Sequence, residues 1–84
     1  MYKFKIFITL KEGILDPEGQ AVQASLKALS FDEVQKVKMG KYIELDVEAA
    51  DEQTARRRVE EMCAKLLANP VIEQYHFELA EAQS

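Results

Sequence analysis

The 84-residue sequence has few of the residues on which side-chain chemistry usually depends. It contains one cysteine, Cys63, one histidine, His76, and no tryptophan. A single cysteine cannot form an internal disulfide, and without a second cysteine or a histidine close in sequence it supports neither a metal site nor a cysteine nucleophile. We interpret His76 as a surface residue and Cys63 as a small apolar residue on a buried helix face. No catalytic or metal-binding residue is predicted.

Glycine is also scarce. Gly13, Gly19 and Gly40 are too far apart to form a phosphate-binding loop. The helix start near the first two carries the carboxylates of Asp16 and Glu18, which would repel an anion. No cofactor is therefore predicted on this chain.

Long hydrophobic runs and an excess of basic residues are missing as well. No apolar run approaches the ~20 residues that span a bilayer, and residues 1–5 do not begin a secretion signal. Fifteen acidic and eleven basic residues give a net charge of −4, which disfavours binding to a nucleic-acid backbone. We expect a cytoplasmic protein without a membrane or nucleic-acid partner.

Apolar residues are plentiful, at 48% of the chain. A chain of this length buries only roughly 60–65% of its unfolded surface, so part of the apolar content is available to another subunit. We predict one domain over residues 1–80, a short disordered tail over 81–84, and a homo-oligomer.

The hydrophobic pattern predicts the order strand, helix, strand, strand, helix, strand. The expected ranges are 2–10, 17–29, 33–39, 42–48, 52–68 and 71–79. In the second strand Val34 and Val37 break strict alternation, which indicates a bulge or an edge position. Gly40 and Lys41 are expected to form the turn of a hairpin. The order is typical of an α+β two-layer sandwich of the ferredoxin-like kind, an antiparallel sheet with two helices on one face.

The second helix is predicted from its apolar stripe and its ends. Asp51 is the expected N-cap, and Asn69 before Pro70 ends the helix by about Ala68. The stripe comprises Ala55, Val59, Met62, Cys63, Leu66 and Leu67. Arg56 to Arg58 are interpreted as a solvated face, with contact to a partner or a phosphate as the alternative.

Charges on the open face of the sheet support this strand order. In the ferredoxin-like arrangement the first strand is central, so Lys3 and Lys5 would lie between Glu44 and Asp46 on one side and Glu78 on the other. Opposite charges across strands contribute about 0.2–1 kcal/mol per pair. The two lysines thus have carboxylates on both predicted neighbouring strands, as this strand order requires.

Apolar residues on the same open face indicate an oligomer contact. Phe7, Tyr42 and Ile72 are expected there among the charges. Phe7 alone could equally be a single exposed aromatic residue. We predict that the three residues form an interface with a second copy.

The stretch Lys11 to Gly19, read KEGILDPEG, joins the first strand to the first helix. Asp16 is a good N-cap, and Pro17 suits the first helical position. Local structure does not explain Lys11, the Ile14-Leu15 pair or Gly19, which are therefore candidates for contact with other groups.

Three stretches together resemble the PurS family, the small subunit of phosphoribosylformylglycinamidine synthase. They are KEGILDPEG at 11–19, GKYIEL at 40–45 and LLANPVIEQY at 66–75. The sequence departs from the family pattern at Ser30, where glycine is usual after the first helix, and at Lys38, where arginine is common. Ser30 in a left-handed helix cap would be mildly strained.

The resemblance implies a non-catalytic subunit that forms a dimer or a dimer of dimers. It would bridge a large synthetase, which binds ATP, magnesium and formylglycinamide ribonucleotide, and a glutaminase that releases ammonia from glutamine. The residues that we expect to form or shape the partner surface are Lys11, Asp16, Pro17, Gly19, Lys41, Asn69, Pro70 and Glu73. Caps and helix ends also explain four of them, Asp16, Pro17, Asn69 and Pro70.

Two other functions fit a domain of this architecture. One is an amino-acid-sensing regulatory domain of the ACT type. The other is an RNA-binding module, which requires basic and aromatic residues interleaved on the open sheet face. Glu44, Asp46 and Glu78 on that face argue against RNA.

Overall fold

A computed structural model describes residues 1–82 of the chain. Three strands and two helices follow one another, and a short π-helix, η1, extends the second helix. Their bounds are β1 Tyr2–Leu10, α1 Pro17–Ala28, β2 Gly40–Val47, α2 Glu52–Met62, η1 Cys63–Leu67 and β3 Glu73–Ala82. The predicted α+β class with an antiparallel sheet is confirmed.

The sheet has the order β2-β1-β3, and β1 is antiparallel to both neighbours. Lys3 pairs with Asp46, and Lys5 lies between Glu44 and Glu78. The central position of β1, predicted from the ferredoxin-like order and supported by the charges, is therefore confirmed.

The core lies between one face of this sheet and α2. Alternation along β1 turns Phe4, Ile6 and Ile8 to this inner face, where they are buried. Helical spacing brings Ala55, Val59 and Cys63 against them. The rings of Phe4 and Phe77 meet edge to face, with centroids 5.8 Å apart.

The end of the second helix differs from the prediction at Leu66. The backbone N–H of Ala68 donates to the carbonyl of Cys63, five residues back, at 3.0 Å. This wider turn changes the phase of the apolar stripe. Cys63 stays buried, but the side chain of Leu66 is 82% exposed. Its assignment to the core stripe was wrong.

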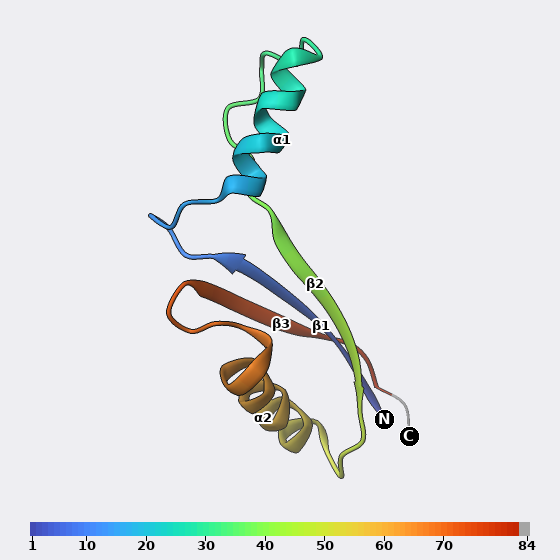
Figure 1. Cartoon of the computed structure of the whole chain (residues 1–84). Coiled ribbons are helices and arrows are strands. Elements are labelled where there is room, and N and C mark those ends of the chain that lie inside the picture. Colours follow the sequence, from blue (N-terminus) through green and yellow to red (C-terminus); the bar gives the residue numbers. More distant parts are fainter. Residues whose placement is uncertain (83–84) are drawn as a thin grey trace.

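The first helix stands away from the rest of the molecule. Figure 1 shows α1 projecting beyond the end of the sheet, while α2 alone covers the inner face. The radius of gyration is 16.4 Å, against about 12 Å for a compact domain of this length. The prediction that both helices cover one face is therefore not met within a single chain. We call residues 11–39, which contain α1, the arm.

The predicted strand over 33–39 is not formed, and Gly40 and Lys41 belong to β2 instead of a turn. A strand needs a neighbour for its backbone ladder. This segment returns along α1, where the side chain of Gln23 donates to the carbonyl of Gln35 at 3.1 Å. It then runs directly into β2 (Figure 1), so no hairpin is made.

The last strand continues further than predicted. Glu81 and Ala82 belong to β3, although they were assigned to the tail. Gln83 and Ser84, the rest of the predicted tail, lie outside the described residues.

Candidate functional site

Lys11 joins the end of β1 to the turn that precedes β3. Its ammonium donates to the carbonyl of Pro70 at 2.6 Å, and its backbone N–H donates to the carbonyl of Ile72 at 2.8 Å. Residues 59 apart in sequence are thus held together at one end of the sheet. The prediction left Lys11 without a local contact, and the structure gives it a long-range one.

Glu73 fixes the same turn from the other side. One carboxylate oxygen accepts the backbone N–H of Asn69 at 2.7 Å, and the other lies 3.4 Å from the ammonium of Lys41. The side-chain oxygen of Asn69 accepts the N–H of Val71 at 3.0 Å. Five predicted partner residues therefore lie in one surface, which we call the corner surface: Lys11, Lys41, Asn69, Pro70 and Glu73.

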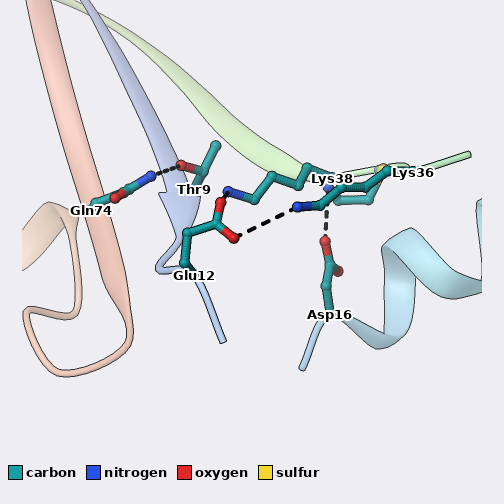
Figure 2. Close-up of polar contacts among 7 residues, drawn as sticks. Thr9, Glu12, Asp16, Lys36, Lys38 and Gln74 are labelled. Carbon is teal, nitrogen blue, oxygen red and sulfur yellow. Dashed lines mark hydrogen bonds and ion pairs between the residues drawn. The ribbon is translucent and has the colours of Figure 1, made fainter. Parts of the chain in front are cut away.

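Asp16 connects the two ends of the arm. One of its oxygens accepts the N–H of Gly19 at 2.9 Å, which caps α1, and Pro17 follows at the first helical position. The other oxygen accepts the N–H of Met39 at 3.0 Å (Figure 2). The hydrogen bonds from Met39 and then Gly19 lower the pKa of Asp16 below its usual value, because they favour the charged carboxylate.

Gly19 is required by a close approach of the returning segment. It is the buried residue of α1, and a Cβ atom there would lie 2.5 Å from the carbonyl oxygen of Val37. Only glycine fits between that backbone and the cap of Asp16. The reason for this residue is long-range packing, which the local sequence did not reveal.

A second carboxylate, Glu12, joins the same two segments and was not singled out in the sequence. Its oxygens lie 3.1 Å from the ammonium of Lys38 and 3.6 Å from that of Lys36 (Figure 2). The hydrogen bond from Lys38 and the charges of both lysines lower the pKa of Glu12. Nearby, the side chain of Gln74 donates to the hydroxyl of Thr9 at 3.3 Å. Two lysines separated by one residue form no recognisable motif, so the sequence did not predict their ion pairs with Glu12.

The base of the arm borders two hollows. A shallow one of about 160 Å³ includes Leu10, Asp16, Met39, Lys41 and Glu73 in its lining, so it connects the cap of α1 to the corner surface. A larger groove of about 450 Å³ lies along residues 10–16 and 36–38 and includes the apolar side chains of Ile14 and Leu15. Of the predicted partner residues, Lys11, Asp16, Lys41 and Glu73 line these hollows, and Asn69 and Pro70 are joined to them by the hydrogen bonds of Glu73 and Lys11.

The open face of the sheet carries a cluster of three rings. Phe7 lies 4.8 Å from His76 in a stacked pair and 5.3 Å from Tyr42, measured between centroids. The Tyr42 hydroxyl donates to Glu44 at 2.7 Å, and this bond raises the pKa of Tyr42. Phe7 and Tyr42 meet as predicted for one surface, whereas Ile72 precedes β3 and takes no part in the ring cluster.

Comparison with known proteins decides the family. The family model for PurS, described as phosphoribosylformylglycinamidine (FGAM) synthase, matches residues 3–81. The chain belongs to the PurS family. It is 51% identical to the FGAM synthase subunit PurS of Bacillus subtilis, over 96% of this chain and 95% of that one.

Solved PurS structures share the fold. The structure of PurS from Methanocaldococcus jannaschii matches with a TM-score of 0.87 and 42% identity, over 99% of this chain and 100% of that one. A chain of the PurLQS structure from Thermotoga maritima matches with a TM-score of 0.87 and 33% identity, over 93% of this chain and 95% of that one. These relatives do not support the alternative of an ACT-like sensor.

Within residues 1–82, the histidine and the cysteine are both taken up by packing contacts. His76 stacks on Phe7, and burial raises the pKa of the Cys63 thiol, which keeps it protonated. Among the described residues, no three histidine, cysteine or acidic side chains are placed to share a metal ion. Within the same range, none of the helices has the length and apolar character needed to span a membrane. The corner surface and the base of the arm offer charged and apolar side chains for contact with another surface.

Proposed function

We propose that this chain is a non-catalytic subunit that holds the synthetase and glutaminase subunits of FGAM synthase together in the cytoplasm. The observation that carries the proposal is the match over nearly the whole chain to a component of PurLQS, a complex whose name includes two further subunits. The synthetase would bind ATP, magnesium and formylglycinamide ribonucleotide. The glutaminase would supply ammonia for the replacement of an amide oxygen by nitrogen.

The surface assigned to these partners is the corner surface together with the base of the arm. Its side chains are held by contacts within the chain, so little conformational freedom is lost on binding. Its charges are of both signs: Lys41 pairs with Glu73, Lys36 and Lys38 pair with Glu12, and Asp16 and Glu18 lie at the start of α1. A partner surface that also carries charges of both signs would complement this arrangement.

Self-association is the second part of the proposal. On the arm, Leu29 is 69% exposed and Phe31 is exposed too, which is costly for side chains of this size in a lone chain. On the inner face of the sheet, Ile43 and Leu45 are only half-buried beside α2. The arm of a second copy, laid on this face, would complete the two-helix layer that the sequence predicts. Its segment 33–39 would add the missing strand beside β2.

The ring cluster of the open face suits a further contact between such dimers. Phe7 and Tyr42 remain the proposed interface residues, and Ile72 is a predicted member at its margin. Two aromatic side chains among alternating charges are typical of interface cores with polar rims. A dimer of dimers is the expected outcome.

Mixing the three chains tests the bridging role. Size-exclusion chromatography with light scattering should show one complex that contains all three, and no complex of synthetase with glutaminase when this chain is left out. Lys11→Glu should weaken the complex and keep the fold, with only a small loss of stability from its exposed hydrogen bond to the Pro70 carbonyl, which thermal unfolding measures alongside. Lys27→Glu, the same charge reversal at another exposed lysine, is the matched control. Unchanged co-elution of Lys11→Glu would remove this residue from the surface.

The sensor alternative is tested on the isolated chain. Calorimetry with amino acids and nucleotides should give no saturable heat, since the partner subunits bind the small molecules. Saturable binding by this chain alone would favour a sensor.

A further inference from the structure

The open face of the sheet has its rings in a single row across the strands. Phe7 pairs with Tyr42 on β2 and with His76 on β3, and both pairs are in ring contact. The helix α2 covers the opposite face and the arm projects beyond the end of the sheet (Figure 1), which leaves Tyr42 51% exposed and His76 exposed as well. A row of rings at the surface is suited to contact with another molecule.

The two sides of this ring row differ in charge. Toward the start of β1 the open face carries charged side chains, which are Lys3, Lys5, Glu44, Asp46, Glu78 and Glu81. On the other side the next row consists of Thr9, Gly40 and Gln74, none of which is charged. The amide of Gln74 donates to the hydroxyl of Thr9 at 3.3 Å. One side of the face is therefore charged, and the other is polar without charge.

A second copy of the same face fits this pattern when the two-fold axis runs across the strands, through the ring rows. The rings of the two copies then meet, and the charged row of each copy lies over the uncharged row of the other. Lys5 faces Thr9 of the second copy, and Glu78 faces its Gln74. The Gln74 amide has a second N–H for the carboxylate, and oxygens of both residues can accept from the ammonium. Both charges thus meet hydrogen-bonding groups.

The other face-to-face orientation is unfavourable. With the two-fold axis along β1, each lysine of the face would lie over the same lysine of the second copy, and Glu44 would lie over Glu78. Like charges directly opposite one another are destabilising. The charges of the face therefore select the axis that runs across the strands.

The size of the face suits a contact that is made twice. Three strands about 4.8 Å apart and about 26 Å long present roughly 400 Å², half of the ~800 Å² per partner that is usual for a stable interface. In a symmetric dimer of dimers each contact occurs twice, which brings the buried area to the usual size. The proposed arm contact uses the inner face beside α2 and leaves the open faces of the dimer free.

We propose that the open faces of two copies pack ring row on ring row, with the two-fold axis across the strands and Glu78 of each copy opposite Gln74 of the other. The inference rests on the proposed self-association. It adds His76, Gln74 and Glu78 to the contact and fixes how the two dimers are oriented.

Charge changes at Gln74 test this orientation. Gln74→Lys places an ammonium opposite Glu78 of the second copy and should lower the dissociation constant between dimers by about threefold or more, whereas Gln74→Glu should raise it by about as much. Sedimentation velocity over a range of concentrations measures this constant, and the thermal midpoint is followed alongside. Gln53→Lys and Gln53→Glu, at an exposed position of α2, are the matched controls and should leave the constant unchanged.

Glu78→Gln separates a contact between copies from an effect within one chain. Residues 74 and 78 lie about 13 Å apart along the same strand, too far for direct contact in one chain. In the Glu78→Gln background, Gln74→Lys and Gln74→Glu should therefore give nearly equal dissociation constants, because the charge that distinguishes them belongs to the second copy. A merely structural role of Gln74 would leave their difference in place.

Three outcomes would overturn the inference. Tetramers could form with the Gln74 variants behaving like the Gln53 variants, or with their difference unaffected by Glu78→Gln, and then the dimer of dimers stands but its contact is elsewhere. The parent chain could stay a dimer at every concentration, so that the arm contact stands and the open faces do not meet. The parent chain could be a monomer, and then the proposed self-association fails as well.

Discussion

The ammonium of Lys41 lies 3.4 Å from the carboxylate of Glu73, although the two residues belong to the two outer strands of the sheet. The pair passes over the end of β1, where Lys41 is beside Ile8 and Glu73 is beside Leu10. Because Glu73 also accepts the N–H of Asn69, one carboxylate ties β2 to the turn before β3. The corner surface therefore depends on contacts between three segments that are far apart in the sequence.

Lys41→Glu should loosen this corner. It places a carboxylate beside Glu73, and because Lys41 is exposed the cost is expected to be about 1 kcal/mol or less in unfolding free energy. Hydrogen exchange should become faster at the amides of Asn69 and Glu73. Lys41→Gln, which removes the charge without reversing it, should have a smaller effect. Exchange in both variants equal to that of the parent chain would mean that the ion pair does not hold the turn.

Gly19→Ala should destabilise the arm. The added methyl would meet the carbonyl oxygen of Val37 at 2.5 Å, and overpacking of this kind costs about 1–3 kcal/mol. Chemical unfolding of the variant measures the loss. Gln20→Ala, one position further along α1 and exposed, should be close to neutral. A stability of Gly19→Ala equal to that of Gln20→Ala would contradict the close packing of the returning segment.

Ser30→Gly should stabilise the protein. The end of α1 places Ser30 at φ 74°, while the N–H of Phe31 bonds to the carbonyl of Leu26 at 2.9 Å in a Schellman arrangement. Removing the side chain from this left-handed position should raise the unfolding free energy by about 1 kcal/mol. Ser25→Gly, inside α1, should lower it by about 0.5–1 kcal/mol. If the thermal midpoints of Ser30→Gly and Ser25→Gly shifted in the same direction, the left-handed strain assigned to Ser30 would be refuted.

Asp16 should contribute to the loss of stability in acid. Its pKa in the folded state lies below the ordinary 3.8, so its contribution is complete above that value and disappears as the pH falls through the lowered pKa. Asp16→Asn should reduce the dependence of stability on pH in this range and lower stability at neutral pH. The measurement is a series of unfolding curves from neutral pH into acid. If the unfolding free energy fell with decreasing pH equally in Asp16→Asn and in the parent chain, Asp16 would be excluded as a contributor.

Tyr75 should be slow to ionise in alkali. Its hydroxyl donates to Glu60 at 2.6 Å, and this bond raises its pKa to about 12. The stabilisation is present below the ordinary value of 10.0 and is lost as the pH rises from there to about 12. Glu60→Gln should bring the ionisation back toward the ordinary value, as followed by phenolate absorbance. A titration unaffected by this variant would show that Glu60 is not the cause.

Local patterns were sufficient to predict much of the fold. Strict alternation predicted β1, and Asp51, whose side chain accepts the N–H of Thr54 at 2.7 Å, was recognised as the cap of α2. The ferredoxin-like order predicted the neighbours of β1, and the charges of Lys3 and Lys5 supported it. These features depend on residues close in sequence, or on opposite charges that face one another on neighbouring strands.

The errors arose where distant or unusual backbone decides the outcome. The segment 33–39 has the composition of a strand, but within one chain it has no strand beside it. Leu66 has helical spacing, but a π-turn removes it from the core. Among the site residues, Asp16 and Pro17 were explained by capping, whereas the contacts of Lys11, Gly19 and Lys41 needed the three-dimensional arrangement. Their proposed roles toward partners remain predictions.

The most direct test of the assembly role is FGAM synthesis by purified synthetase and glutaminase, assayed with glutamine in the presence and absence of this chain. Little glutamine-dependent product should form without the chain, full activity should return when it is added, and the chain alone should turn over nothing. Ammonia supplied in place of glutamine should make the chain largely dispensable. Equal glutamine-dependent rates with and without the chain would contradict the account.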